Sequence, residues 1–245
     1  MLSAECRAFE SMLRSSPQVN YDLKVDPLKI AKEMRALFSI DKVVPRPAGC
    51  KFKKQIYEYD RRTAEAYWID YRTGTKNWDA DLIILYLHGG GYRNSLPSFM
   101  RVNMIEFCIF SINDTSNLLF KKEFPLSVST YSGFECHLSH IFNATIIHLE
   151  YRCAPEHPFP AAIDDALTLY RAILQDGISP SRLAIMGDSA GRGLTLLTIQ
   201  SLLARQLPKP RVTITLSTWT DFSLSGESFT RNRPQNVILH AEEFP

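Results

Sequence analysis

The sequence has almost no net charge, few cysteines and no long apolar run. Its 245 residues include 28 lysines and arginines against 26 aspartates and glutamates, a formal charge of +2, so electrostatics give no reason to expect a nucleic-acid partner. No stretch approaches the roughly 20 apolar residues that a transmembrane helix needs, and no export signal opens the chain. We therefore expect a cytoplasmic protein without a transmembrane segment.

The cysteines are odd in number and are spaced neither as metal ligands nor as a redox pair. This scatter predicts reduced, structural thiols, and it gives no reason to expect a metal or a cofactor. Apolar residues are abundant by comparison, at 45% against 22% charged residues, which is typical of a globular protein with one large core. The five cysteines are Cys6, Cys50, Cys108, Cys136 and Cys153.

Apolar runs alternate with helical patterns along most of the chain. Residues 56–59 and 64–71 alternate in the manner of an antiparallel pair at a sheet edge, and nearby lysines would keep that edge solvated. The whole pattern predicts an α/β fold with a mostly parallel, doubly wound sheet and helices on both faces. Further strands are expected at 82–87, 145–150, 182–187 and 211–217, and helices at about 132–142, 160–175 and 190–206.

Two segments stand apart from this alternation. Residues 1–45 contain helical spacing that predicts either cap helices or ordinary amphipathic packing helices, in front of a core spanning 46–245. Residues 93–130 are too many for a normal connection. We interpret them as an insertion, either translated non-coding sequence or a lineage-specific loop, with a substrate lid as the alternative.

The most informative motif is Gly187-Asp188-Ser189-Ala190-Gly191. It follows an apolar strand pattern and precedes a helical one, and a serine between two glycines at such a junction is typical of a nucleophile elbow. The turn is tight enough that the flanking positions require glycine. The motif predicts Ser189 as a nucleophile, with Asp188 bracing the loop.

A second motif, His88-Gly89-Gly90-Gly91, follows the expected strand at 82–87. Glycines expose backbone N–H groups to a ligand, and this run is typical of the oxyanion loop of lipases and esterases. A flexible turn with no ligand is the alternative. Because His88 precedes Ser189, whereas the base of this fold follows the nucleophile, we expect it to stabilise the loop.

With a third segment, Tyr151–Asp165, in the same order, the chain resembles the hormone-sensitive lipase family (GDXG lipolytic enzymes) of the α/β-hydrolase fold. The resemblance runs from about residue 57 to the last residue. It implies a serine carboxylesterase or lipase that cleaves small-molecule or lipid esters through an acyl-enzyme, without cofactor or metal. It also implies an oxyanion hole formed by Gly90, Gly91 and Ala190.

The chain departs from this family after the elbow. Asp221 matches a structural position, and His240 is the single histidine after Ser189, so the resemblance implies that the triad acid and histidine are absent. We therefore expect that the last strands of the fold are missing and that activity is impaired. The free sheet edge would then allow a second copy to pair with it as a homodimer. Arg192 and Thr218 replace a family glycine and proline. The alternatives are a non-catalytic, ligand-binding pseudo-hydrolase and a fragment without a stable fold.

Overall fold

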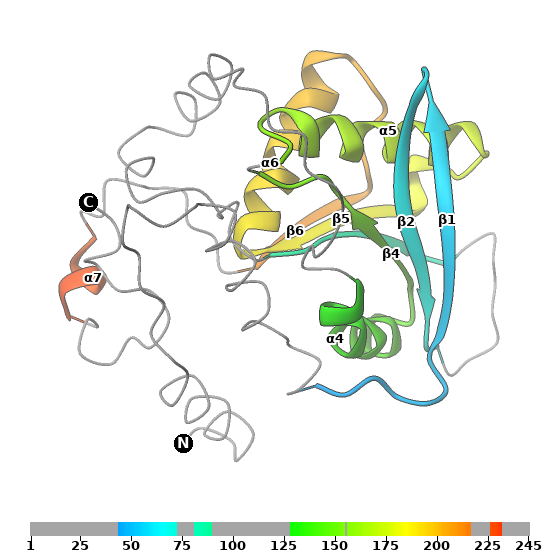
Figure 1. Ribbon diagram of the computed structural model, residues 1–245, viewed down its shortest axis with the longest axis vertical. Coiled ribbons are helices and arrows are strands. Elements are labelled where there is room, and N and C mark those ends of the chain that lie inside the picture. The colour runs from blue at the N-terminus through cyan, green and yellow to red at the C-terminus, as the bar shows by residue number, and fades with distance from the viewer. Residues whose placement is uncertain (1–43, 73–80, 90–127, 155, 217–225, 232–245) are drawn as a thin grey trace.

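The computed structural model describes residues 44–72, 81–89, 128–154, 156–216 and 226–231 (Figure 1). The expected cap helices lie outside these ranges, as do most of the expected insertion, Gly90, Gly91 and His240. The elements in chain order are β1 (Lys51–Tyr59), β2 (Arg62–Asp70), β3 (Ile83–Leu87), α4 (Val128–Phe142), β4 (Thr145–Glu150), α5 (Ala161–Gln175), the 3-10 helix η3 (Pro180–Arg182), β5 (Leu183–Asp188), α6 (Ser189–Ala204), β6 (Val212–Leu216) and α7 (Glu227–Arg231).

The described strands form one mixed sheet in the order β1-β2-β4-β3-β5-β6. β1 and β2 are antiparallel, β2 is antiparallel to β4, and the four strands from β4 to β6 run parallel. The predicted edge pair and the mostly parallel, doubly wound sheet are therefore confirmed. Each parallel strand also falls within about one residue of the predicted range.

Helices cover both faces of the sheet, as predicted: α5 and α6 lie on one face and α4 on the other (Figure 1). β3 shows why, because all five of its residues are buried. Ile83, Leu85 and Leu87 belong to the core under α5 and α6, whereas Ile84 and Tyr86 belong to the core under α4. Alternate side chains of a strand point to opposite faces, so a continuous apolar run needs cover on both.

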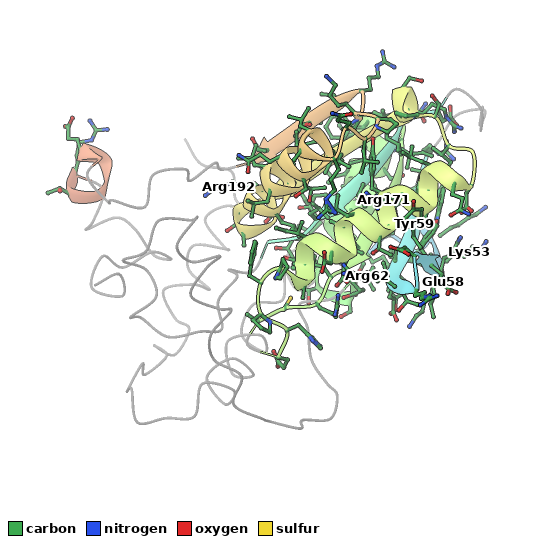
Figure 2. The ribbon with its side chains drawn as sticks, turned by 90° about the horizontal axis from the view of Figure 1, so that it is seen from above. Lys53, Glu58, Tyr59, Arg62, Arg171 and Arg192 are labelled. Carbon is green, nitrogen blue, oxygen red and sulfur yellow. A yellow bond between two sulfur atoms is a disulfide. The ribbon has the colours of Figure 1, made fainter. Side chains whose placement is uncertain are left out.

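A cation–π contact adds to the packing of α5 on the edge strand. The Arg171 guanidinium carbon of α5 lies 5.3 Å from the centre of the Tyr59 ring of β1. Both residues are labelled in Figure 2. Contacts of this kind are worth roughly 0.5–1 kcal/mol at exposed sites and more when desolvated. α5 is thereby held to the sheet by charge as well as by apolar burial.

Two expectations need correction. α4 begins at Val128, so the last three residues of the expected insertion belong to this helix. Cys50 and Cys136 form a disulfide across 86 residues of sequence, with their Cα atoms 6.0 Å apart, so the expectation of reduced thiols is wrong for this pair. Cys153 is in no disulfide and is half-buried. The spacing of the cysteines did not predict this disulfide, because the fold brings α4 back beside Cys50, the residue that precedes β1.

No helix in the described ranges is both long enough and apolar enough to span a membrane.

Candidate active site

The predicted nucleophile elbow lies where β5 ends and α6 begins. β5 ends at Asp188 and α6 begins at Ser189, whose φ is +47°. This left-handed conformation is uncommon for a residue with a Cβ and persists only where the surrounding structure holds it. The Ser189 side chain is exposed although the strand before it is buried. The turn thus lifts a hydroxyl out of the sheet at the carboxyl end of a central strand.

The two glycines of the motif are needed because backbone passes close to both. A Cβ on Gly191 would lie 1.9 Å from the Leu87 carbonyl oxygen and 2.5 Å from that of His88. A Cβ on Gly187 would lie 2.4 Å from the Gly191 oxygen. No side chain fits at such distances, so the first turn of α6 packs directly on the end of β3. This contact brings the elbow against the loop that begins at His88.

Asp188 ties the elbow to that loop. One carboxylate oxygen accepts hydrogen bonds from the Tyr86 hydroxyl at 2.7 Å and from the Gly89 backbone N–H at 2.8 Å, and the other accepts from the Tyr131 hydroxyl at 3.3 Å. Burial raises the pKa of Asp188 above its ordinary value, although the three donors act against the shift. The first glycine of the loop is therefore held next to Ser189 by a buried polar network.

His88 is part of the interior and not of the surface. It is 1% exposed, its Nδ1 donates to the Gly89 carbonyl at 2.8 Å, and its ring stacks on Tyr151 with centroids 4.3 Å apart. The Tyr151 hydroxyl donates to the His88 carbonyl at 2.6 Å. Burial lowers the pKa of His88 to about 3, so the ring is neutral at pH 7 and is unsuited to act as the base.

Of the three residues predicted to form an oxyanion hole, the structure describes only Ala190. Ala190 is the second residue of α6 and is buried, in the first turn where helix N–H groups have no intrahelical acceptor. The other two predicted donors, the N–H groups of Gly90 and Gly91, lie outside the described residues. The three-donor oxyanion hole therefore stays a prediction.

The third motif, Tyr151–Asp165, contains an ion pair between Arg152 and Asp165. The Arg152 side chain and backbone N–H both donate to Asp165 of α5, with guanidinium contacts from 2.7 to 3.0 Å. His157 is exposed. Arg192, near the N-terminal end of α6 (Figure 2), is only 5% exposed, so the unusual arginine is accommodated inside the protein.

The described residues include no side chain that is hydrogen-bonded to Ser189 as a proton acceptor would be. In the described ranges, no histidine shares a hydrogen bond with Ser189, and Asp221 and His240 lie outside those ranges. Sequence reasoning missed Tyr86 and Tyr131 as partners of Asp188. A tyrosine within a fully buried strand, as at Tyr86, is the available signal, because a buried hydroxyl needs an acceptor.

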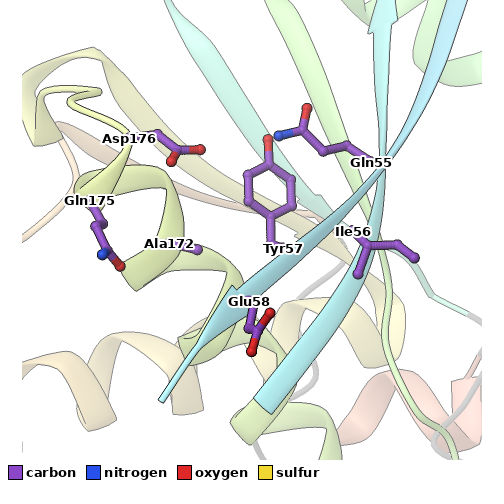
Figure 3. A pocket seen from close by; sticks show the side chains of 7 residues that line it. All are labelled: Gln55, Ile56, Tyr57, Glu58, Ala172, Gln175 and Asp176. Atoms are coloured by element: carbon purple, nitrogen blue, oxygen red, sulfur yellow. The ribbon is translucent and has the colours of Figure 1, made fainter. Parts of the chain in front are cut away.

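A pocket in the described part of the chain lies away from the elbow. It has a volume of about 420 Å³ between β1 and α5 and is lined mainly by polar side chains (Figure 3). None of its lining residues belongs to the elbow or to the loop after β3. The lining residues are Gln55, Ile56, Tyr57, Glu58, Ala172, Gln175 and Asp176.

Comparison with known proteins agrees with this geometry. The profile of a protein family that has the alpha/beta hydrolase fold matches residues 126–244 of the chain. The crystal structure of an esterase from the bacterial hormone-sensitive lipase family superimposes with a TM-score of 0.67 at 25% identity, covering 100% of this chain and 67% of that one. The chain has the α/β-hydrolase fold and is similar to these esterases. The esterase EstE5 gives a TM-score of 0.70 at 24% identity, covering 99% and 67%.

Curated relatives of this α/β-hydrolase match over shorter segments. An acetyl-hydrolase of Streptomyces hygroscopicus is 38% identical over 96 residues, which are 39% of this chain and 32% of that protein. An esterase of Acinetobacter venetianus is 36% identical over 118 residues, 47% and 38% of the two chains. The chain thus spans between about a third and two fifths of the length of these relatives.

Proposed function

We propose that this α/β-hydrolase is a carboxylic-ester hydrolase with Ser189 as its nucleophile. The observation that carries the proposal is an exposed serine at φ +47°, packed against a loop that the Asp188–Gly89 hydrogen bond holds in place. The names of its relatives, esterase and acetyl-hydrolase, support an ester substrate with a short acyl group. A lipid ester remains the second substrate class that the resemblance implies.

The reaction follows from these parts. Ser189 Oγ attacks the acyl carbon as its proton passes to a base, and the carbonyl oxygen gains a negative charge that backbone N–H groups stabilise. The carbon–oxygen bond to the alcohol then breaks, the alcohol leaves with a proton, and Ser189 carries the acyl group. Water attacks this acyl-enzyme, the acid is released and Ser189 regains its proton. No cofactor takes part in this proposed sequence of steps.

The identity of the base and the rate of turnover stay predictions. His240, the single histidine after Ser189 in the sequence, is the candidate base. The low turnover and the ligand-binding pseudo-hydrolase predicted from the sequence are the alternatives that experiment must separate. The homodimer also stays a prediction. The cytoplasmic location has an argument against it, because disulfides such as Cys50–Cys136 persist mainly in oxidising compartments.

Hydrolysis of p-nitrophenyl esters from acetate to long acyl chains tests the proposal. We expect saturable turnover that is fastest with the short chains. A chain that melts cooperatively and is stabilised by esters, but releases no p-nitrophenol above background, would instead be the ligand-binding pseudo-hydrolase. A chain without a cooperative melt would be an unfolded fragment.

A further inference from the structure

Two histidines and a glutamate meet in the interior behind the loop that begins at His88. Tyr86 of β3 is paired with His148 of β4, which places His88, two residues further on, level with Glu150. His88 and His148 are 1% and 0% exposed. One ligand atom from each of His88, His148 and Glu150 lies within 4.8 Å of the other two. The register of two parallel strands therefore gathers the three side chains in one buried place.

Hydrogen bonds fix the ring nitrogen that each histidine leaves unused. His88 Nδ1 lies 2.8 Å from the Gly89 carbonyl oxygen, and His148 Nδ1 lies 2.6 Å from Glu135 Oε1. A carbonyl or carboxylate oxygen accepts, so both Nδ1 atoms carry the hydrogen. The Nε2 atoms of both rings are buried and have no hydrogen-bond partner. His88 Nε2 therefore presents a lone pair to the interior, and leaving either buried Nε2 without a partner is costly.

The partners of the Nδ1 atoms are the kind that metal-binding histidines use. Such histidines donate their other N–H to a carboxylate or a backbone carbonyl, which orients the ring and fixes its tautomer. Glu135 plays the first part for His148, and Gly89 plays the second for His88. Glu135 and the Glu150 side chain also place two carboxylates, 0% and 12% exposed, around the single His148 ring. This excess of negative charge favours a cation.

We propose that His88 Nε2, His148 Nε2 and a Glu150 oxygen bind a divalent transition-metal ion such as Zn²⁺. Two imidazoles and a carboxylate suit this class of ion. Tetrahedral Zn²⁺ needs ligand atoms about 3.3–3.6 Å apart. His148 Nε2 and Glu150 Oε1 are already 3.7 Å apart, and all three ligand atoms lie within 4.8 Å of one another, so small shifts of the side chains would complete the site. The ion would join β3 to β4 beneath the oxyanion loop and support the fold, independently of the proposed esterase function.

The direct test is the metal content of the untagged chain after equilibration with Zn²⁺ alone and gel filtration. We expect one ion per chain and a higher melting temperature than after treatment with a chelator. X-ray absorption of the loaded wild-type chain is expected to show two imidazole ligands, a readout that needs no variant. A folded chain that retains no zinc, or one whose zinc has fewer than two imidazole ligands, overturns the proposal.

Variants then locate the ion. His148→Gln and Glu150→Gln are expected to lose stoichiometric zinc, and Glu135→Gln to weaken it by about 10–100-fold through His148. His137→Gln is the matched control, because His137 is an exposed histidine on the same helix as Glu135 and is expected to keep full binding. Equal zinc content in His148→Gln and His137→Gln would place the ion elsewhere and contradict the proposal.

Discussion

Ser189→Ala is expected to lower the hydrolysis of p-nitrophenyl acetate by at least about 10³-fold. Alanine cannot form the acyl-enzyme, so only attack by water remains, helped by binding and by the oxyanion donors. The Ser189 side chain is exposed, with no hydrogen bond in the described structure, so its removal is expected to leave the fold intact. Initial rates and melting curves of both chains, measured on one preparation, check the two halves of this expectation.

Ser181→Ala is the matched control, since Ser181 is an exposed serine of η3. Its rate is expected to equal that of the wild type. If Ser189→Ala retained the wild-type rate, the hydrolysis would arise from other groups, and Ser189 would not be the nucleophile.

Gly191→Ala is expected to destabilise the chain by about 3–5 kcal/mol, a large part of the 5–15 kcal/mol that a typical domain has. The new Cβ would lie 1.9 Å from the Leu87 carbonyl oxygen, and both atoms belong to backbone that packed elements hold. Relief requires α6 to move away from β3, which would also disturb the elbow. Helix propensity alone predicts the opposite sign, a gain of about 1 kcal/mol. Urea denaturation followed by circular dichroism measures the difference.

Gly49→Ala is the control for this prediction. The nearest atom to a Cβ at Gly49 is Tyr71 Cε2, at 3.4 Å, which is an ordinary contact. We expect its free energy of unfolding to change by no more than about 1 kcal/mol. If Gly191→Ala were as stable as Gly49→Ala, the close approach of α6 to β3 would be wrong.

The parallel strands could be predicted from sequence because both their faces are buried. β4 begins and ends as predicted, at Thr145 and Glu150, since an uninterrupted apolar run is the local signature of such a strand. The elbow could also be predicted from sequence. Its glycines are required by contacts within a short segment and with the start of a neighbouring loop. Local sequence patterns were therefore enough to predict the fold class and the position of Ser189.

Contacts between distant residues could not be predicted in this way. The Cys50–Cys136 disulfide joins positions 86 residues apart, and Tyr86 reaches Asp188 across 102 residues. The neighbourhood of His88 and His148 also depends on strand register. No periodicity encodes these pairings, because the tertiary fold creates them. The oxyanion donors Gly90 and Gly91 remain sequence predictions, because they lie outside the described residues.

Reaction with a fluorophosphonate probe, followed by mass spectrometry of the peptides, tests the central claim most directly. The claim is that the elbow presents Ser189 as an activated nucleophile beside oxyanion donors. The account predicts one phosphonyl adduct, on Ser189 and on no other serine, which is absent from Ser189→Ala. A chain that melts cooperatively yet forms no adduct, or forms it on another serine, would contradict the account.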